Sequence, residues 1–280
     1  MKTDKATVVL LLLVFVLTLA SSALFTLKTE QLYTYLGLSS PASAAPFPPF
    51  LELVYIVGGI LVFTGIILLL IRYGLTKIIV GFFAVISFLV LVQFLDVVFS
   101  PLFFEISDLF SLLPFIVAIF MMVYYFKYAG LPFRNFTNII IFLTIASIVS
   151  FALGVVPSLI LIGIIAVYDY IAVFVTKHMI TLAKGLGNGV FLGGLIFAAK
   201  KALRGRIMLG GGDVVFPAVL IDALYLNYPP IAAVLSIIGA VVGLSVLLFF
   251  GKHGKAYPAM TFIGPAQIGF FGIYLLTTII

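Results

Sequence analysis

Cysteine is absent from this chain of 280 residues, and so is tryptophan. Without cysteine the chain can form no disulfide framework, no thiolate nucleophile and no cysteine-ligated zinc or iron–sulfur centre. Histidine is scarce: the sequence has two, His178 and His253, each in a predicted loop, whereas metal sites usually gather ligands at short, paired spacings. We therefore expect neither a bound metal nor a cofactor.

Charged residues are also few, at 9% of the chain, whereas hydrophobic residues make up 64%. Apolar runs of about 20 residues, the length that a helix needs to cross a bilayer, recur throughout. The sequence thus predicts an all-α polytopic membrane protein with nine transmembrane helices, and it leaves no room for a separate soluble domain. The predicted spans are Ala6–Leu27, Leu51–Ile71, Ile78–Phe99, Leu109–Phe126, Phe136–Val156, Ser158–Thr176, Ile207–Tyr228, Pro230–Phe250 and Ala259–Ile280.

The basic residues predict the orientation in the cell membrane. Every Lys and Arg except Lys28 falls in the N-terminal tail or in the loops after the second, fourth, sixth and eighth predicted spans. Because positive charge marks the cytoplasmic side, we expect the N-terminus inside and the C-terminus outside. The net charge of +6 then reflects topology and gives no support to nucleic-acid binding. Asn135-Phe136-Thr137 fits a glycosylation sequon, but a cytoplasmic position predicts no sugar there.

Two aspartates fall inside apolar segments of membrane length: Asp169 in the sixth predicted span and Asp213 in the seventh. A charge at the centre of a membrane helix costs about 2.5 to 3.5 kcal/mol on insertion scales, so such an acid is a functional candidate. At a helical rise of about 1.5 Å per residue, Asp169 lies about 12 Å from Lys177 and Asp213 about 10 Å from Arg206. These matching depths, toward the cytoplasmic side, would let the two carboxylates meet. Asp222, about 13 Å farther along, could not join them.

Two carboxylates at one depth suit two kinds of chemistry. Like charges a few ångströms apart cannot both ionise, so such a pair holds one proton and offers a base and an acid together. The ionised member can activate a water molecule for attack on a peptide carbonyl while the protonated member donates to the developing oxyanion. Paired membrane acids also load and release protons or cations in transporters and channels. The carboxylates alone leave both possibilities open, although we find no internal repeat of the kind common in transporters.

Three glycines, Gly210, Gly211 and Gly212, precede Asp213. They leave the backbone beside the carboxylate without side chains and weakly held as a helix, so another chain could approach it closely. A protease needs that access, because a substrate helix must be unwound to an extended form, often by adding as a strand to an exposed edge. Small-residue packing between membrane helices would also favour glycine.

The sequence resembles the presenilin and signal-peptide-peptidase family of intramembrane aspartyl proteases at three places. Tyr168-Asp169 matches the family's Tyr-Asp motif, and Gly210-Gly211-Gly212-Asp213 matches Gly-x-Gly-Asp. Pro258-Ala259-Met260 matches Pro-Ala-Leu, with methionine as a volume-conserving replacement for leucine. The order of the motifs, in the sixth, seventh and ninth predicted spans, is specific to the family. The segment Pro265–Phe270 looks closer to signal peptide peptidases, whereas the predicted orientation is that of presenilins. This combination resembles the archaeal members of the family.

The resemblance implies a function and a site. The function would be hydrolysis of peptide bonds within transmembrane helices of substrate proteins or signal peptides, with Asp169 and Asp213 as the catalytic pair. The expected partners are substrate helices and the lipid bilayer, and a homo-oligomer is left open. The residues that would shape the active site or contact the substrate are Tyr168, Gly210, Gly211, Gly212, Pro258, Ala259 and Met260.

Two alternatives use the same acids. A prepilin-type peptidase also carries Gly-x-Gly-Asp, but a lysine commonly follows two residues after that aspartate, and Val215 stands there in this chain. A proton-coupled transporter or cation channel would show flux without cleavage.

The chain is expected to divide into a scaffold and a catalytic region. Residues 1–156 would form a five-helix membrane scaffold, and residues 157–280 would form the catalytic region with spans six to nine. A cytoplasmic connection, residues 177–206, would join spans six and seven. Its apolar, glycine-rich middle, Leu186–Ala199, is too short for a span and predicts an interfacial segment near the cytoplasmic mouth of the site.

Overall fold

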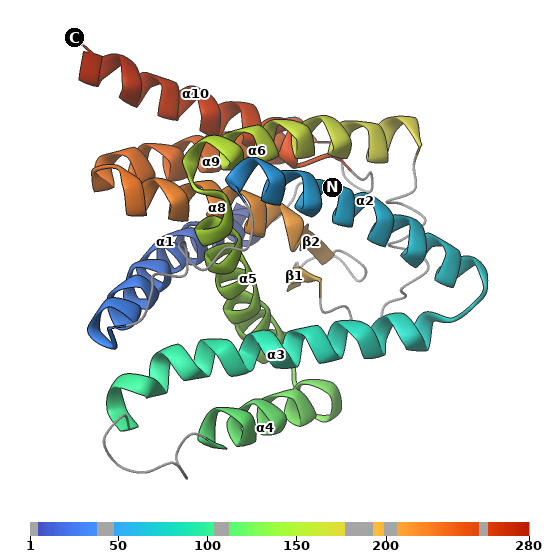
Figure 1. Ribbon diagram of the computed structural model, residues 1–280. Helices are drawn as coiled ribbons and strands as arrows, with labels where there is room; N and C mark the ends of the chain where they lie inside the picture. Colours follow the sequence, from blue (N-terminus) through green and yellow to red (C-terminus); the bar gives the residue numbers. More distant parts are fainter. Residues whose placement is uncertain are drawn as a thin grey trace.

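The structure, a computed structural model, describes residues 5–37, 48–103, 112–176, 193–198, 206–251 and 257–279. Within these residues a helix lies at each place where the sequence predicts a span (Figure 1). A short π-helix, η3 (Ile171–Val175), continues α6, and two strands, β1 (Gly194–Ala198) and β2 (Arg206–Gly210), precede α8. The helices are α1 (Lys5–Tyr35), α2 (Pro49–Arg72), α3 (Thr76–Phe103), α4 (Leu113–Lys127), α5 (Leu131–Leu153), α6 (Val155–Tyr170), α8 (Gly212–Asn227), α9 (Pro230–Phe250) and α10 (Met260–Ile279).

Seven of these helices, with α6 and η3 taken together, are long and apolar enough to cross a membrane. The other two, α4 with 15 residues and α8 with 16, are shorter. At about 1.5 Å per residue, α8 is about 24 Å long, whereas the hydrocarbon core of a bilayer is about 30 Å thick. The predicted helical membrane architecture is therefore confirmed in its main lines, and the β-hairpin is an addition that the sequence analysis did not predict.

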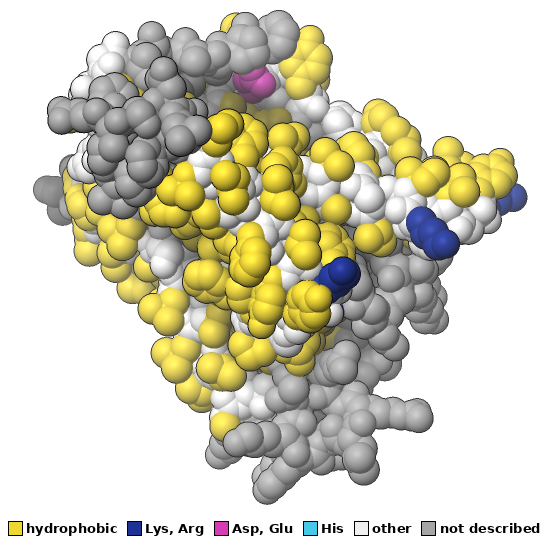
Figure 2. Space-filling view, turned by 90° about the horizontal axis from the view of Figure 1, so that it is seen from below, with side chains coloured by type: hydrophobic (Ala, Val, Ile, Leu, Met, Phe, Trp, Pro, Cys, Tyr) yellow, Lys and Arg dark blue, Asp and Glu magenta, His cyan; other side chains and the backbone are white. Residues whose placement is uncertain are grey.

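The outer surface of the helices is apolar, as lipid requires. Figure 2 shows a face covered mainly by hydrophobic side chains, broken by few charged ones. Large apolar side chains are widely exposed on α1, α2 and α4, for example Leu17, Val62 and Phe120, the last at 71%. Exposed apolar surface on this scale marks contact with another apolar phase, and the helices present it to the bilayer.

Helix α8 lies at the centre of the bundle and packs against α1, α5, α6 and α9 (Figure 1). Every residue from Pro217 to Leu224 is buried. This buried stretch covers about two full turns, so α8 has no free face there and the surrounding helices fix its position. Asp213 lies in the first turn of this central helix.

The β-hairpin corrects the predicted start of the seventh span. Residues 206–210 form strand β2 instead of helix, and β2 pairs antiparallel with β1, from Gly194 opposite Gly210 to Ala198 opposite Arg206. The apolar run 207–209, between Arg206 and Gly210, suits a short strand as well as a helix, and the pairing with β1 decides between them. The helical rise assumed between Arg206 and Asp213 is therefore wrong, because extended residues advance about 3.3 Å each. Most of the connection 177–206, including the larger part of Leu186–Ala199, lies outside the described residues.

Glycines bring α10 very close to the helices on either side of it. A Cβ atom added to Gly243 of α9 would lie 2.5 Å from the Phe262 carbonyl oxygen, and one added to Gly239 would lie 2.8 Å from the Ala266 carbonyl oxygen. On the α6 side, a Cβ atom on Gly264 would lie 2.9 Å from the Ile162 side chain. Glycine at four-residue spacing is a common means of close helix packing in membranes. Helix α10 is thus wedged between α9 and α6, which fixes its N-terminus.

We expect Gly243→Ala to destabilise the protein by about 1 to 3 kcal/mol, because the added methyl group would push two helix backbones apart. Gly272→Ala is the matched control, since a Cβ atom at that position of α10 would meet nothing within 4 Å. Circular dichroism during thermal unfolding in detergent measures the difference in this tryptophan-free chain. Equal melting temperatures for the two variants would show that α9 and α10 do not pack in this way.

Candidate active site

Asp169 lies in the last turn of α6, with 7% of its surface exposed. The main-chain N–H of Met260, the first residue of α10, donates a hydrogen bond to Asp169 Oδ2 at 3.0 Å. The first N–H groups of any helix lack intrahelical partners, so this donor is free to bind a carboxylate. Next to it, the Thr261 hydroxyl donates to the Ala166 carbonyl oxygen at 3.0 Å. These two bonds hold the N-terminus of α10 against the end of α6.

The chain widens into the π-helix η3 directly after Tyr170. Such π-helical turns inside helices are rare and are frequently found at functional sites. On the same turn as Asp169, the Tyr168 hydroxyl donates to Thr64 Oγ1 of α2 at 3.4 Å. The segment that carries Asp169 is therefore held by α10 and by α2.

Asp213 follows directly on the hairpin, at the N-terminus of α8. The residue is half-buried, and its carboxylate accepts a hydrogen bond from the main-chain N–H of Gly210. A Cβ atom on Gly210 would lie 3.0 Å from Asp213 Oδ2. The Gly211 N–H donates to the Gly193 carbonyl oxygen at 2.6 Å, and a Cβ atom on Gly211 would lie 2.8 Å from the Phe142 ring. Small residues here leave space for the carboxylate on one side and for the hairpin on the other.

The structure brings the predicted motifs to one place. Helices α6 and α8 pack together, and the carboxyl groups of Asp169 and Asp213 lie within electrostatic range of each other. Pro258, Ala259 and Met260 are buried at the end of α10 that reaches Asp169. Among the described residues, no cluster of three or more His, Asp or Glu could hold a metal ion, and His178 and His253 lie outside that part of the chain. The arrangement offers two carboxyl groups, each with one main-chain N–H donor.

Asp222 has a different partner. Its carboxylate is fully buried and accepts a hydrogen bond from Ser22 Oγ of α1 at 2.7 Å. This bond ties α8 to α1 across the bundle, and Asp222 stands two and a half turns along α8 from Asp213.

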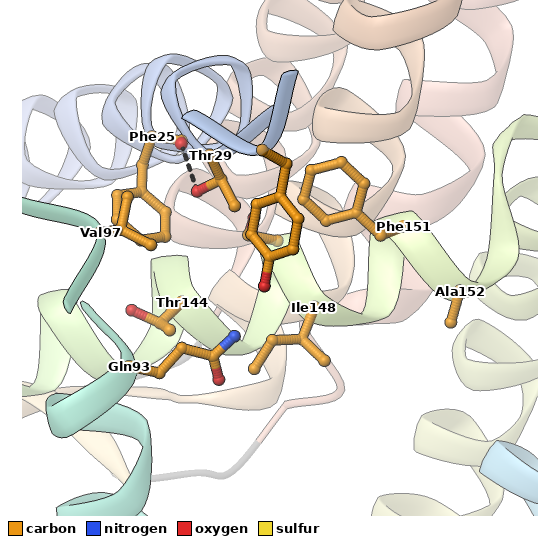
Figure 3. Close-up of a pocket in the computed structure, with 10 residues that line it drawn as sticks. Phe25, Thr29, Gln93, Val97, Thr144, Ile148, Phe151 and Ala152 are labelled. Atoms are coloured by element: carbon orange, nitrogen blue, oxygen red, sulfur yellow. Dashed lines mark hydrogen bonds between the residues drawn. The ribbon is translucent and has the colours of Figure 1, made fainter. Parts of the chain in front are cut away.

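A cavity of about 200 Å³ lies apart from the aspartates, between α1, α3 and α5 (Figure 3). Thr29 on α1, Gln93 on α3, and Thr144 and Phe151 on α5 are among its lining residues. None of the residues that line it comes from α6, α8 or α10, so it contributes no group to the candidate site.

Sequence reasoning missed the residues of α5 that contact the hairpin. Asn135 and Asn138 are hydrogen-bonded to the main chain of β1, and Asn138 is 2% exposed. Asn138 lies inside the predicted span Phe136–Val156, and Asn135 directly precedes it. A polar side chain inside an apolar span is unfavourable unless it has a partner, so Asn138 was a signal that could have indicated a non-helical neighbour.

The family described as "Signal-peptide peptidase, presenilin aspartyl protease" matches residues 8–191 of the chain. This range contains Asp169 and ends before Gly210. The fold is similar to that of a presenilin family intramembrane aspartate protease solved in space group C222, with a TM-score of 0.67 and 22% sequence identity over 95% of this chain and 99% of that chain. A structure of such a protease in space group P2 gives a TM-score of 0.62 and 25% identity over 92% of this chain and 97% of that one.

We expect Met260→Pro to lower kcat/KM for a single-span peptide roughly 10- to 100-fold relative to Met260→Ala. Both changes remove the buried side chain, but only proline removes the N–H that binds Asp169, and a hydrogen bond to a charged group contributes about 1.5 to 3 kcal/mol. Proline is well tolerated at the first position of a helix, so α10 should persist. Equal kcat/KM for the two variants would mean that the N–H has no part in the activity.

Proposed function

The chain belongs to the signal-peptide peptidase and presenilin family of aspartyl proteases, and on that premise we propose that Asp169 and Asp213 are its catalytic pair. The protein is an intramembrane aspartyl protease. We assign the pair because the three sequence motifs lie close together in the structure. Asp169 accepts the N–H of Met260, and Asp213, beside Gly210, lies within electrostatic range of Asp169. The match to this family does not favour the alternative functions, which were a prepilin-type peptidase, a transporter and a channel.

The geometry suits a reaction in which the two carboxyl groups share one proton. The ionised aspartate removes a proton from a water molecule, whose oxygen attacks the carbonyl carbon of the scissile peptide bond. The protonated aspartate donates to the carbonyl oxygen as negative charge develops there. The aspartate that took the proton from water then gives it to the amide nitrogen, and the carbon–nitrogen bond breaks. The other aspartate takes back a proton from a hydroxyl group of the intermediate, so the products are a carboxylic acid and an amine and the pair again holds one proton. Because each aspartate accepts one main-chain N–H, the two acids are similarly supported and can exchange roles.

The hairpin supplies a place for an extended substrate. A peptide bond in a helix is shielded by its own hydrogen bonds, and adding the unwound segment as a strand to a sheet edge would satisfy its main chain again. Strand β2 ends at Gly210, three residues before Asp213, so a segment paired with β2 would pass close to the catalytic pair.

Strand β2 also supports a position of the active site within the membrane. Because α8 is shorter than the hydrocarbon core, the extended residues of β2 would complete the seventh span. Non-helical backbone at membrane depth is tolerated only where protein buries it or where it lines a water-filled cavity, and hydrolysis needs that water. With α4 and α8 included, the proposed topology has nine spans. The basic residues support a cytoplasmic N-terminus, an outer C-terminus and a site in the cytoplasmic half.

The proposed scaffold and catalytic region, residues 1–156 and 157–280, share an interface. Helices α1 and α5 of the first region pack against α8 of the second. The scaffold would thus hold Asp213 in place and shield its own side of the site from lipid, while transmembrane helices of other proteins reach the site from the bilayer on another side.

We expect Asp169→Asn and Asp213→Asn each to reduce cleavage of single-span peptides by at least about a thousandfold, because an amide cannot transfer the proton that general acid–base catalysis requires. Mass spectrometry of the products locates the cuts, which should fall in the cytoplasmic half of the span. A transition-state mimic of aspartyl proteases should inhibit the unaltered protein. Cleavage by either variant at the normal rate would contradict the assignment.

Asp222→Asn provides the matched acid-to-amide control on the same helix. The amide oxygen can still accept the hydrogen bond from Ser22, so we expect a folded protein that keeps most of its activity. A loss of cleavage as large as that of Asp213→Asn would mean that replacing either acid of α8 abolishes activity. The effect of Asp213→Asn would then not support a catalytic role for Asp213.

A further inference from the structure

The outer edge of strand β1 is occupied by side chains instead of a third strand. Asn135 Nδ2 donates to the Ile196 carbonyl oxygen at 2.8 Å, and the Ile196 N–H donates back to Asn135 Oδ1 at 3.0 Å. This exchange of two hydrogen bonds with one residue is the pattern that a neighbouring antiparallel strand would make. One turn farther along α5, Asn138 Nδ2 donates to the Gly194 carbonyl oxygen at 2.8 Å. We call Asn135 and Asn138 the asparagine clamp.

The clamp is itself supported by a neighbouring helix. The Tyr125 hydroxyl of α4 donates to Asn138 Oδ1 at 3.3 Å, and both side chains are buried. The guanidinium carbon of Arg134 lies 5.6 Å from the centre of the Tyr125 ring, a distance that permits a cation–π contact. A buried amide that is hydrogen-bonded through both its oxygen and its nitrogen has little freedom to turn, so α4 and α5 together fix the position of β1.

The clamp also determines which edge of the hairpin stays open. Ile196 and Gly194 direct main-chain groups toward α5 and away from β2. In an antiparallel pair, residues opposite each other both point inward or both point outward, so Met208 and Gly210 direct their N–H and C=O groups to the far edge of β2. The Gly210 N–H accordingly reaches Asp213. Within the described residues the sheet consists of β1 and β2 alone.

We propose that Asn135 and Asn138 are positioning residues that act as a surrogate strand. They close the edge of β1 and fix the hairpin, so that an extended substrate adds to β2 beside Asp213 in one register. The substrate part of this inference rests on the proposed function, whereas the clamp itself does not.

The register follows from strand geometry. A strand pairs with its neighbour in steps of two residues, because a slip of one would turn every side chain to the other face. If the clamp is loosened and β1 and β2 shift, the substrate should pair in a second register. The peptide bond presented to the aspartates would then lie two residues from the normal one.

Asn135→Ala removes both bonds to Ile196 at a partly exposed position, so it is the variant that most readily folds. Asn138→Leu removes the bond to Gly194 while keeping the branching and the number of side-chain heavy atoms, and it provides a second test at a buried position. Thr137→Val is the matched control, because Thr137 is fully buried between the two, and its hydroxyl has no hydrogen-bond partner among the described residues.

Hydrogen exchange of the full chain in detergent tests the clamp without any need for activity. The Ile196 amide should exchange about tenfold faster in Asn135→Ala than in the unaltered protein, and Thr137→Val should leave its rate unchanged. Unchanged exchange of residues 194–198 in Asn135→Ala and in Asn138→Leu would overturn the clamp. Accelerated exchange throughout α5 in both clamp variants would also overturn it, because the amides would then be ordinary contributors to folding.

Cleavage kinetics test the effect on the substrate. For the clamp variants we expect KM to rise about fivefold to tenfold, kcat to change less than about twofold, and new cuts two residues from the normal bond. A fall in kcat alone, with unchanged KM and cut positions, would contradict the proposed role. If the unaltered protein cuts no peptide, the proposed function fails, and the exchange measurement still decides whether the clamp exists.

Discussion

A main-chain N–H or C=O group inside a bilayer finds no water to bind, and the architecture around the aspartates depends on that constraint. A helix satisfies these groups internally, but peptide hydrolysis requires an extended chain and water at the same place. The structure resolves the conflict by starting α8 late and giving main-chain groups of β1, β2 and α10 specific partners, whereas no described strand pairs with the outer edge of β2. Strand β1 pairs with β2, Asn135 and Asn138 cover the outer edge of β1, and the first N–H of α10 binds Asp169.

The same constraint explains how the third motif contacts Asp169 although its last residue departs from the family pattern. Met260 contacts Asp169 through its main-chain N–H, which any residue except proline provides. Its side chain is 1% exposed and fills space in the core, a task for which methionine and leucine are nearly equivalent. Close approach at Gly239, Gly243 and Gly264 places this N–H correctly, so residues far from the aspartates in sequence control the geometry of the site.

Apolar length and the position of isolated acids were enough to predict the helices and the two candidate aspartates. Long apolar runs have few alternatives to a helix in lipid, and a carboxylate there stands out in any sequence. The hairpin could not be predicted in the same way. The run at Ile207–Leu209 fits a strand and a helix equally, and the decision depends on pairing with β1 and on amides of α5, which are tertiary contacts. The matching depths of Asp169 and Asp213 were inferred from a helical rise that does not hold before Gly212, although the structure places the two carboxyl groups within range of each other.

The central claim is that Asp169 and Asp213 face each other. Because the chain has no cysteine, this claim can be tested directly by cross-linking. Paired cysteines would be introduced at 169 and 213, with a protease site inserted in the connection between them, and treated in membranes with a short bifunctional thiol reagent. A pair at 169 and 260 is the positive control for reagent access, since the Met260 N–H lies 3.0 Å from the Asp169 carboxylate. The account predicts that both pairs keep the cut fragments joined, whereas a pair at 169 and 222 does not. Linkage of the control pair without linkage of 169 to 213 would contradict it.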